Sequence, residues 1–262
     1  MHNGNVGQGL EAILARADAT AALPRLGGMA RPNGVVIVSE RYWAFACKDG
    51  TLREGTMPVL PAWLHRIPLA RGLARLGLSL APLFRRSGVA GRRERPLLFA
   101  ALIAPFLLFV LPGAWRTPVG LAATIALGAW MLRGRTLRLH GAEHRAIGAV
   151  EERSLIETWE GRALPTRFSR RCGTNFAALA MPMTWLADRF WPLAPEVWTP
   201  VAVTAVALAA TMELWRFAQI RHLGFLLLPG LALQRLTTRE PALDETRIAL
   251  RATASVLERE LG

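Results

Sequence analysis

Two long uncharged stretches stand between arginine-rich segments in the middle of the chain. Pro96–Trp115 carries no charged residue, and as a helix rising about 1.5 Å per residue it is long enough to cross a hydrocarbon core of about 30 Å. Pro118–Leu132 follows after a short break at Arg116. This segment is slightly short, so flanking side chains would have to reach the membrane interface. The pattern predicts a transmembrane helical hairpin.

A second pair of apolar segments lies further along the chain and has a weaker pattern. The first covers Thr174–Ala187 and extends to Trp191, and the second covers Val197–Met212. The connection contains two prolines and tryptophans of the kind found at membrane interfaces. We therefore expect a second transmembrane hairpin. Leu223–Leu233 is apolar but too short to span, so it would be either buried or re-entrant.

The remaining apolar and polar positions predict structure outside the bilayer core. Gly34–Met57 alternates β-branched and aromatic residues and contains a Lys-Asp-Gly turn, which predicts a small β-hairpin. Leu60–Phe84 has apolar positions at helical spacing with arginines between them. This pattern is typical of an amphipathic helix on the membrane surface, and equally of a helix packed on a cytoplasmic domain. Pro241–Leu261 predicts an amphipathic terminal helix with Pro241 in its first turn.

These elements together predict a fold class. We expect an all-α multi-span membrane protein with about four transmembrane helices, a small cytoplasmic β-hairpin and amphipathic helices. The expected division is an N-terminal cytoplasmic segment (1–58), an interfacial helix (59–90), a first transmembrane hairpin (91–134), a cytoplasmic motif segment (135–173), a second hairpin (174–218), and a short hydrophobic segment with a C-terminal cytoplasmic helix (219–262).

Composition favours a membrane protein over other classes. The 262 residues carry a net charge of +13, yet 52% of them are hydrophobic and the mean hydropathy is +0.26. A nucleic-acid-binding protein is basic but rarely this apolar. A soluble enzyme of this composition does not normally contain uncharged runs of membrane length. A soluble basic domain with buried helices is the alternative reading.

The distribution of arginines predicts an orientation. Arginine-rich stretches precede the first and third predicted spans and follow the second and fourth, whereas the turns between paired spans carry few charges. The positive-inside rule then places both termini in the cytoplasm, with the spans in the inner membrane. The expected partner is the lipid bilayer, with no nucleic acid. The two cysteines, Cys47 and Cys172, do not form a disulfide framework.

The stretch "LHGAEHRAI" carries the most specific chemistry. His140 and His144 are four residues apart, so on a helix they share one face, as metal-chelating histidine pairs do. Glu143 would act as a general base on a metal-bound water or as a further ligand. The stretch follows the second predicted span, which places it at the cytoplasmic face. The alternative is a solvated helix end without chemistry.

A metal site needs further ligands, and three residues are candidates for the role. Glu151 lies about 10 Å of helix rise beyond His144, too far unless the helix breaks at Gly148. Cys172 precedes the third predicted span, and its thiolate would complete a soft site. A buried structural cysteine is the alternative there. Glu213 lies at the cytoplasmic end of the fourth predicted span, with a local salt bridge to Arg216 as its alternative.

The stretch "LQRLTTREP" is dense in hydrogen-bonding groups. It favours an anion or lipid head-group site whose binding residues would be Gln234, Thr237, Thr238 and Arg239. The alternative is a helix cap leading into the terminal helix.

Several of these motifs occur together in a known family. "RIPLARGLARL", "HGAEHRAI", "RCGTNF", "MELWRFA" and "PGLALQRLTTREP" appear in this order, and the likeness runs from about Leu26 to Leu257. The chain thus resembles the YqhQ-like bacterial membrane proteins, a family of unknown function described as predicted metal-dependent enzymes. The resemblance implies a multi-span inner-membrane protein with its polar motifs on the cytoplasmic side. It does not imply a particular reaction.

The chain departs from the family pattern in places that bear on the site. Ser169-Arg170 stands where the family usually has His-Pro, and Val150 and Met212 stand where it has tyrosine before glutamate. The glycine-rich opening of the family is shortened to "LGGMARPNG". If the missing histidine is a ligand in relatives, the site has been altered here, and His222 is a candidate substitute.

Three functional readings follow. The first is a metal-dependent hydrolase of a membrane-proximal small molecule or lipid, with Glu143 as catalytic residue and a divalent ion such as zinc held by His140, His144, Glu213 and Cys172. The second is a non-enzymatic membrane scaffold or assembly factor whose polar motifs are structural. The third, transport, is disfavoured because no ionisable residue falls in the middle of a predicted span.

Overall fold

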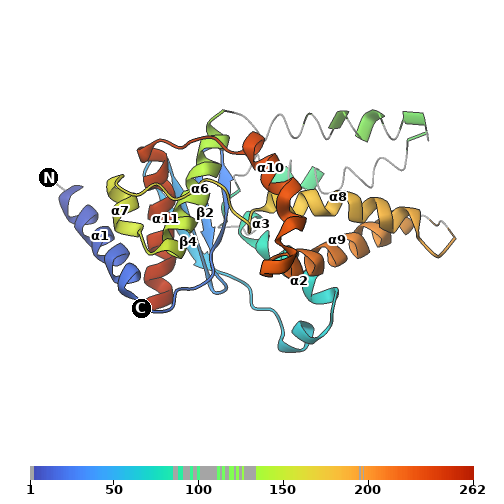
Figure 1. Cartoon of the computed structure of the whole chain (residues 1–262), viewed down its shortest axis with the longest axis horizontal. Helices are drawn as coiled ribbons and strands as arrows, with labels where there is room; N and C mark the ends of the chain where they lie inside the picture. The colour runs from blue at the N-terminus through green and yellow to red at the C-terminus, as the bar shows by residue number, and fades with distance from the viewer. Residues whose placement is uncertain are drawn as a thin grey trace. The chain divides into compact units, whose positions relative to one another are not determined.

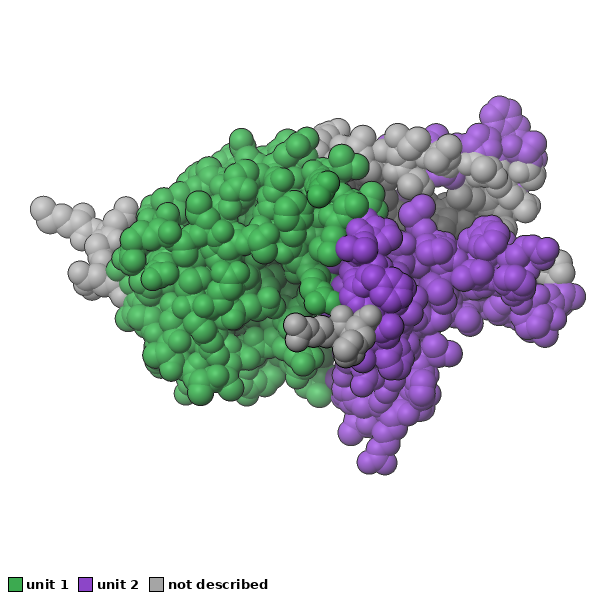
Figure 2. All heavy atoms as spheres, in the orientation of Figure 1, with its two compact units in different colours: residues 1–59, 134–174, 231–262 green, residues 60–133, 175–230 purple. Residues whose placement is uncertain are grey.

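The chain divides into two compact units (Figure 2). The computed structural model describes residues 3–84, 88–90, 95–96, 99–100, 111–112, 114–115, 118–120, 122–123, 126, 134–194, 196 and 198–262. Unit 1 consists of residues 1–59, 134–174 and 231–262, and unit 2 of residues 60–133 and 175–230. The chain therefore leaves unit 1 and returns to it twice.

Unit 1 is built on a four-stranded antiparallel sheet in which the strands follow one another in chain order. The strands are β1 (Gly27–Arg31), β2 (Gly34–Val38), β3 (Tyr42–Cys47) and β4 (Leu52–Thr56). The β-branched and aromatic residues of β2 and β3 fit the pleated surface of the two central strands. Gly50 closes the turn between β3 and β4 with a φ of +91°, a conformation that glycine adopts without strain.

Two long helices cover one face of this sheet (Figure 1). They are α6 (Arg135–Glu152) and α11 (Leu243–Leu261), which pack against each other as well as against the strands. Alternate strand residues point toward the helices, where Val35, Ile37, Ala44 and Ala46 join the main core. The helices contribute many alanines to this core, and these small side chains let two helices lie close together on one sheet.

Two further helices pack on this core, and the last residues of α10 (Leu228–Thr237) also belong to unit 1. Helix α1 (Asn3–Ala19) packs on α11, and α7 (Leu155–Glu160) packs on both. Asp18 accepts hydrogen bonds from the first backbone N–H groups of α7, which joins α1 to that helix end. Glu245 binds Arg138 at 2.9 Å and also accepts from the backbone N–H of Ala242, so it links the start of α11 to α6.

Unit 2 is helical in its described part. It contains η1 (Ala62–Arg66), α2 (Ala70–Ser79), α3 (Ala81–Phe84), most of α8 (Gly173–Arg189), α9 (Thr199–Ala218), η3 (Arg221–Leu227) and the first residues of α10 (Leu228–Thr237). Helix α2 packs closely on α9, because Gly72 leaves room for Met212. Beside this contact, Arg71 and Glu213 form two hydrogen bonds of 2.7 and 2.6 Å.

The prediction of an all-α protein with about four transmembrane helices is wrong. Unit 1 contains a four-stranded sheet, and among the described residues only α9 is long and apolar enough to cross a membrane, with a mean hydropathy of 1.4. The predicted third span forms α8, but this helix has 17 residues, contains Pro182 and ends in Asp188-Arg189. Leu223–Leu233 is divided between η3 and α10. Apolar composition alone could not separate a span from these shorter helices.

The first predicted transmembrane hairpin lies mostly outside the described residues. The predicted small β-hairpin is present, but it is part of a larger sheet. Strand β1 escaped prediction because "GGMAR" has neither alternation nor β-branched residues. The amphipathic stretch Leu60–Phe84 forms three short helices, since the chain turns at Pro68 before α2 begins. The terminal helix is present as α11, but it begins at Leu243, so Pro241 precedes the helix rather than lying in its first turn; α11 contributes to the core.

Candidate metal centre

Helix α6 presents His140 and His144 on one face, because they are one helical turn apart. Nδ1 of His140 lies 2.8 Å from the carbonyl oxygen of Thr237, and Nδ1 of His144 lies 2.6 Å from that of Arg167. A carbonyl oxygen can only accept, so in the neutral rings both Nδ1 atoms carry the proton and donate it. Both Nε2 atoms are left with an available lone pair.

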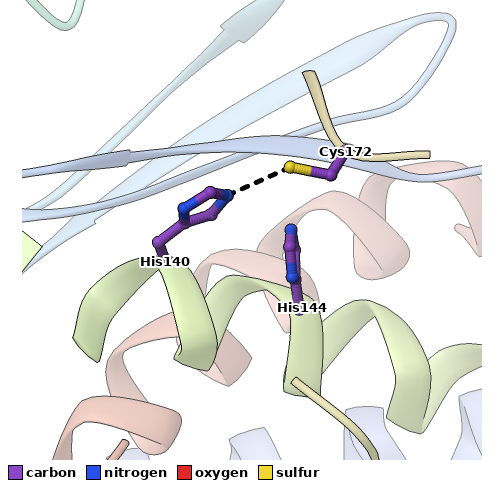
Figure 3. A group of neighbouring side chains, drawn as sticks. All are labelled: His140, His144 and Cys172. Carbon is purple, nitrogen blue, oxygen red and sulfur yellow. Dashed lines mark hydrogen bonds between the residues drawn. The ribbon is translucent and has the colours of Figure 1, made fainter. Parts of the chain in front are cut away.

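Cys172 faces these two rings from the residues before α8 (Figure 3). Its Sγ atom lies 3.2 Å from Nε2 of His140, and the donor atoms of His140, His144 and Cys172 all lie within 4.8 Å of one another. Nε2 of His144 is buried and has no hydrogen-bond partner among the described residues. A buried polar atom without a partner is unfavourable, so this nitrogen marks a place for a ligand.

Burial keeps the three groups uncharged at neutral pH. His144 is 2% exposed and Cys172 is 7% exposed. Desolvation lowers the pKa of His140, and desolvation together with the neighbouring His140 ring lowers the pKa of His144 to about 3. Desolvation and the charge of Glu143 raise the pKa of Cys172 to about 11. The free protein therefore holds two neutral imidazoles and a thiol.

This donor set fits a divalent ion of the zinc type. Zinc binds imidazole nitrogen at about 2.0–2.1 Å and thiolate sulfur at about 2.3 Å, so tetrahedral ligand atoms lie about 3.3–3.8 Å apart. The observed separations need only small inward movements of the side chains. An Nδ1 hydrogen bond to a carbonyl is how metal-binding histidines are usually oriented. The backbone N–H of Thr174, 3.3 Å from Sγ of Cys172, would stabilise a thiolate.

Glu143, the predicted catalytic residue, lies against strand β1. It is 5% exposed, and a Cβ at Gly28 would stand 2.7 Å from its Cγ atom, so the glycine makes room for it. Desolvation raises the pKa of the Glu143 carboxyl to about 8, although the backbone N–H of Ala30 partly opposes this. Glu143 is not one of the three clustered ligands, but it is near enough to act electrostatically on Cys172.

The other predicted acidic ligands are engaged elsewhere. Glu213 belongs to unit 2, where it pairs with Arg71, whereas the three-residue cluster consists of unit 1 residues alone. Glu151 pairs with Arg171 at 2.9 Å. Helix α6 continues through Gly148, so the break that would have brought Glu151 to the histidines is absent. The side chain of His222 lies outside the described part of the structure.

The four predicted substrate-binding residues lie at the end of α10 and just beyond it. Thr237 supplies the carbonyl that orients His140. Gln234 and Thr238 are fully buried, and Oγ1 of Thr238 donates to the carbonyl of Gln234 at 2.7 Å. The Arg239 side chain is exposed, while its backbone N–H donates to the carbonyl of Leu137 on α6 at 2.9 Å. Substrate binding by these residues stays a prediction.

A chain segment beside the metal centre crosses helix α6 at close range. We call Thr237–Pro241 the strap, because it runs across α6 at Gly141. A Cβ on Gly141 would stand 2.2 Å from the carbonyl oxygen of Arg239 and 3.2 Å from Cδ of Pro241. Glycine is therefore required in "HGAEH", since any side chain would push the strap away from the helix.

Sequence reasoning missed the residues that hold the second segment, Pro165–Cys172, which we call the cysteine loop. Arg145 is buried on α6 and donates from Nε to the carbonyl of Pro165 at 3.2 Å, and its guanidinium also pairs with Glu240. The carbonyl of Arg167 orients His144. Arg145 could have been noticed as a charged residue beside Glu143 and His144. Its contact with a backbone carbonyl could not be predicted, because the pattern of side chains does not show which carbonyl lies nearby.

Comparisons with known proteins place the chain among uncharacterised relatives. Residues 94–259 match a family described as a protein of unknown function (DUF1385). The uncharacterized protein YqhQ of Bacillus subtilis (strain 168) is 30% identical over 133 residues, which cover 48% of this chain and 42% of the relative. The matched region thus spans less than half of that protein. No solved structure matches. The matches confirm the resemblance to YqhQ-like proteins, and neither assigns a metal or a reaction.

Replacing Gly141 tests the crossing of the strap. We expect Gly141→Ala to lower the stability of the protein by about 1–3 kcal/mol, because the new Cβ overlaps a backbone oxygen that cannot rotate away. Thermal unfolding of the detergent-purified protein measures the change. Gly77→Ala on α2 is the control, because a Cβ there meets nothing within 4 Å. Equal unfolding temperatures for parent and Gly141→Ala would contradict the crossing.

The raised pKa of Glu143 predicts a pH dependence of stability. The folded protein binds the carboxyl proton more tightly than the unfolded chain, so between pH 4.5 and about 8 stability falls as pH rises, by at most about 1.4 kcal/mol per pH unit. Glu143→Gln removes this contribution. Denaturant unfolding of the chelator-treated protein at several pH values should give a flatter profile for the variant. Parallel profiles for parent and variant would show that Glu143 does not titrate in this range.

Proposed function

We propose that this chain, which belongs to the family of proteins of unknown function DUF1385, is a membrane-associated metal-dependent enzyme whose ion is held by His140, His144 and Cys172. The observation that carries the proposal is the buried Nε2 atom of His144, which has no hydrogen-bond partner among the described residues. The thiol proton of Cys172 can serve only one acceptor at a time, whereas a divalent ion such as zinc satisfies all three donor atoms at once.

The chain's own residues prepare this ligand set. The carbonyls of Thr237 and Arg167 accept hydrogen bonds from the Nδ1–H groups. The protons therefore stay on Nδ1, and the two unprotonated Nε2 atoms face Cys172. Cys172 must release its proton when the ion binds, and the N–H of Thr174 then supports the charge on sulfur. An ion held by these three ligands would have room for a fourth, and in catalytic zinc sites of that kind the ion lowers the pKa of a bound water to about 7.

Hydrolysis of a membrane-proximal substrate is the reaction that this arrangement supports best. Glu143 has a carboxyl pKa of about 8, which suits it to take up and return a proton near neutral pH. Arg239 is exposed at the strap and would hold an anionic group of the substrate. The substrate would be a small molecule or a lipid. No nucleic-acid partner is proposed.

Helix α9 supports the association with a membrane. It spans 20 residues with a mean hydropathy of 1.4, and apolar side chains such as Val201 and Val206 are exposed on it. Such a helix would be stable with these side chains in lipid. We propose that this membrane is the inner membrane of a bacterium, because arginine follows α9 closely, as expected on the cytoplasmic side of a span.

A non-enzymatic scaffold is the second candidate, and a specific observation favours it. His140 and His144 each bind a carbonyl from a different segment, so the two rings already join α6 to the strap and to the cysteine loop. A polar network of this kind stabilises a fold without any ion. In that case the histidines are structural, and their removal affects stability but no metal content.

Elemental analysis of the detergent-purified chain separates the two candidates. We expect about one zinc-type ion per chain, and its loss in His140→Ala, His144→Ala and Cys172→Ser, because each removes one of three ligands. His65→Ala should retain the ion, since His65 is exposed in η1 and outside the cluster. Circular dichroism checks that each variant is folded. Metal-free parent protein after incubation with zinc, iron and manganese would reject the enzyme and favour the scaffold.

A second measurement tests the role of Glu143. Zinc-loaded parent protein is assayed with a chromogenic phosphomonoester and a chromogenic carboxylic ester. Glu143→Gln should keep its zinc but hydrolyse the accepted ester about 10²–10⁴-fold more slowly, because the amide cannot transfer a proton. A variant that retains both zinc and the parent rate would exclude Glu143 as the proton-transferring group.

A further inference from the structure

Gln234 makes an unusual pair of hydrogen bonds for a side chain in the last turns of a helix. Its Oε1 atom accepts from the backbone N–H of Ser169 at 2.9 Å, and its Nε2 atom donates to the carbonyl of the same residue at 2.7 Å. The side chain thus forms hydrogen bonds with both the N–H and the C=O group of one residue, as the backbone of a neighbouring β-strand would. A carboxylate or hydroxyl group cannot replace it, since only an amide offers one acceptor and two donors in this geometry.

The residue that Gln234 holds lies in the middle of the cysteine loop. The carbonyl of Ser169 also accepts from the backbone N–H of Cys172 at 3.4 Å, which closes the turn that presents the thiol. Two residues before Ser169, the carbonyl of Arg167 binds Nδ1 of His144. One pair of hydrogen bonds therefore fixes the loop between two points that both touch the metal centre.

Gln234 is itself held firmly. It is fully buried, and Thr238 closes the end of its helix by donating from N and Oγ1 to the Gln234 carbonyl, at 2.9 and 2.7 Å. One turn further on, the carbonyl of Thr237 binds Nδ1 of His140. The same helix end thus sets the orientation of His140 directly and the position of the cysteine loop through Gln234.

We infer that Gln234 is a positioning residue of the metal centre, which holds Cys172 and the Arg167 carbonyl at the distances that the two histidines require. This inference rests on the proposed function for the identity of the ligand. It gives Gln234 a role other than substrate binding, because both polar atoms of its amide are already bonded to the loop.

The test replaces the amide in the full-length, detergent-purified protein. Gln234→Met keeps the approximate size and loses both hydrogen bonds. Gln234→Glu keeps the acceptor but loses the donor to the Ser169 carbonyl. The matched control is Thr253→Val, another fully buried polar residue of unit 1, whose hydroxyl bonds only within α11. It should lower stability without touching the centre.

The first readout is metal binding. Cobalt titration reports the intensity of the thiolate-to-cobalt charge-transfer band, and competition with a chelator gives the zinc affinity. Both Gln234 variants should bind zinc about 10- to 100-fold more weakly and show a diminished band, as residues that orient metal ligands do when replaced. Thr253→Val should show the parent spectrum and affinity. A parent-like spectrum and affinity in Gln234→Met would overturn the inference.

The second readout needs no metal. Alkylation by iodoacetamide in the presence of chelator, followed by mass spectrometry of both cysteine peptides, uses buried Cys47 as an internal reference. Loss of two hydrogen bonds should raise the rate at Cys172 about tenfold in Gln234→Met and leave Cys47 unchanged. An equal rise at both cysteines would overturn the inference, since it would mean general unfolding. A parent that binds no cobalt would reject the proposed function, and selective exposure of Cys172 would still support the positioning role.

Discussion

Burial of a polar helix face is the constraint on which unit 1 depends. Helix α6 carries two histidines, a glutamate and an arginine into the space between the sheet, the strap and the cysteine loop, where little water reaches them. Buried polar groups must find partners or destabilise the fold. The strap and the cysteine loop, which both contact α6, supply these partners as backbone carbonyls.

The same constraint explains why the centre is suited to a metal ion. Backbone carbonyls accept hydrogen bonds from both Nδ1–H groups, and burial keeps the imidazoles neutral. Of the two rings, only that of His140 lies within hydrogen-bond distance of Cys172 Sγ. One nitrogen, Nε2 of His144, is left over. In a network that served stability alone, a side chain or backbone group would be expected to satisfy it. The enzyme and the scaffold therefore differ in what occupies this one position.

Residues of the centre lie close in sequence to the points where the chain leaves unit 1 and re-enters it. Cys172 comes just before the chain leaves unit 1 in α8, and Thr237 ends α10, in which the chain re-enters unit 1. The ligand and the orienting carbonyl thus follow from where helices begin and end. Helix geometry fixes such positions more firmly than a long loop would, and this precision is what a metal centre requires.

Local patterns in the sequence were enough to predict what depends on neighbouring residues. The shared face of His140 and His144 and the terminal helix follow from helical periodicity, and the Lys48–Gly50 turn follows from turn preferences. Tertiary structure decided the rest, because the deciding contacts join residues far apart in the chain, such as His140 with Cys172, 32 positions away, and with Thr237, 97 positions away. It brought Cys172 into the centre and paired Glu213 with Arg71. It also built unit 1 on a four-stranded sheet covered by two helices, where the sequence had predicted an all-α protein. The periodicity of a sequence shows which side of a helix or strand is apolar. It does not show which distant backbone group will pack against that side.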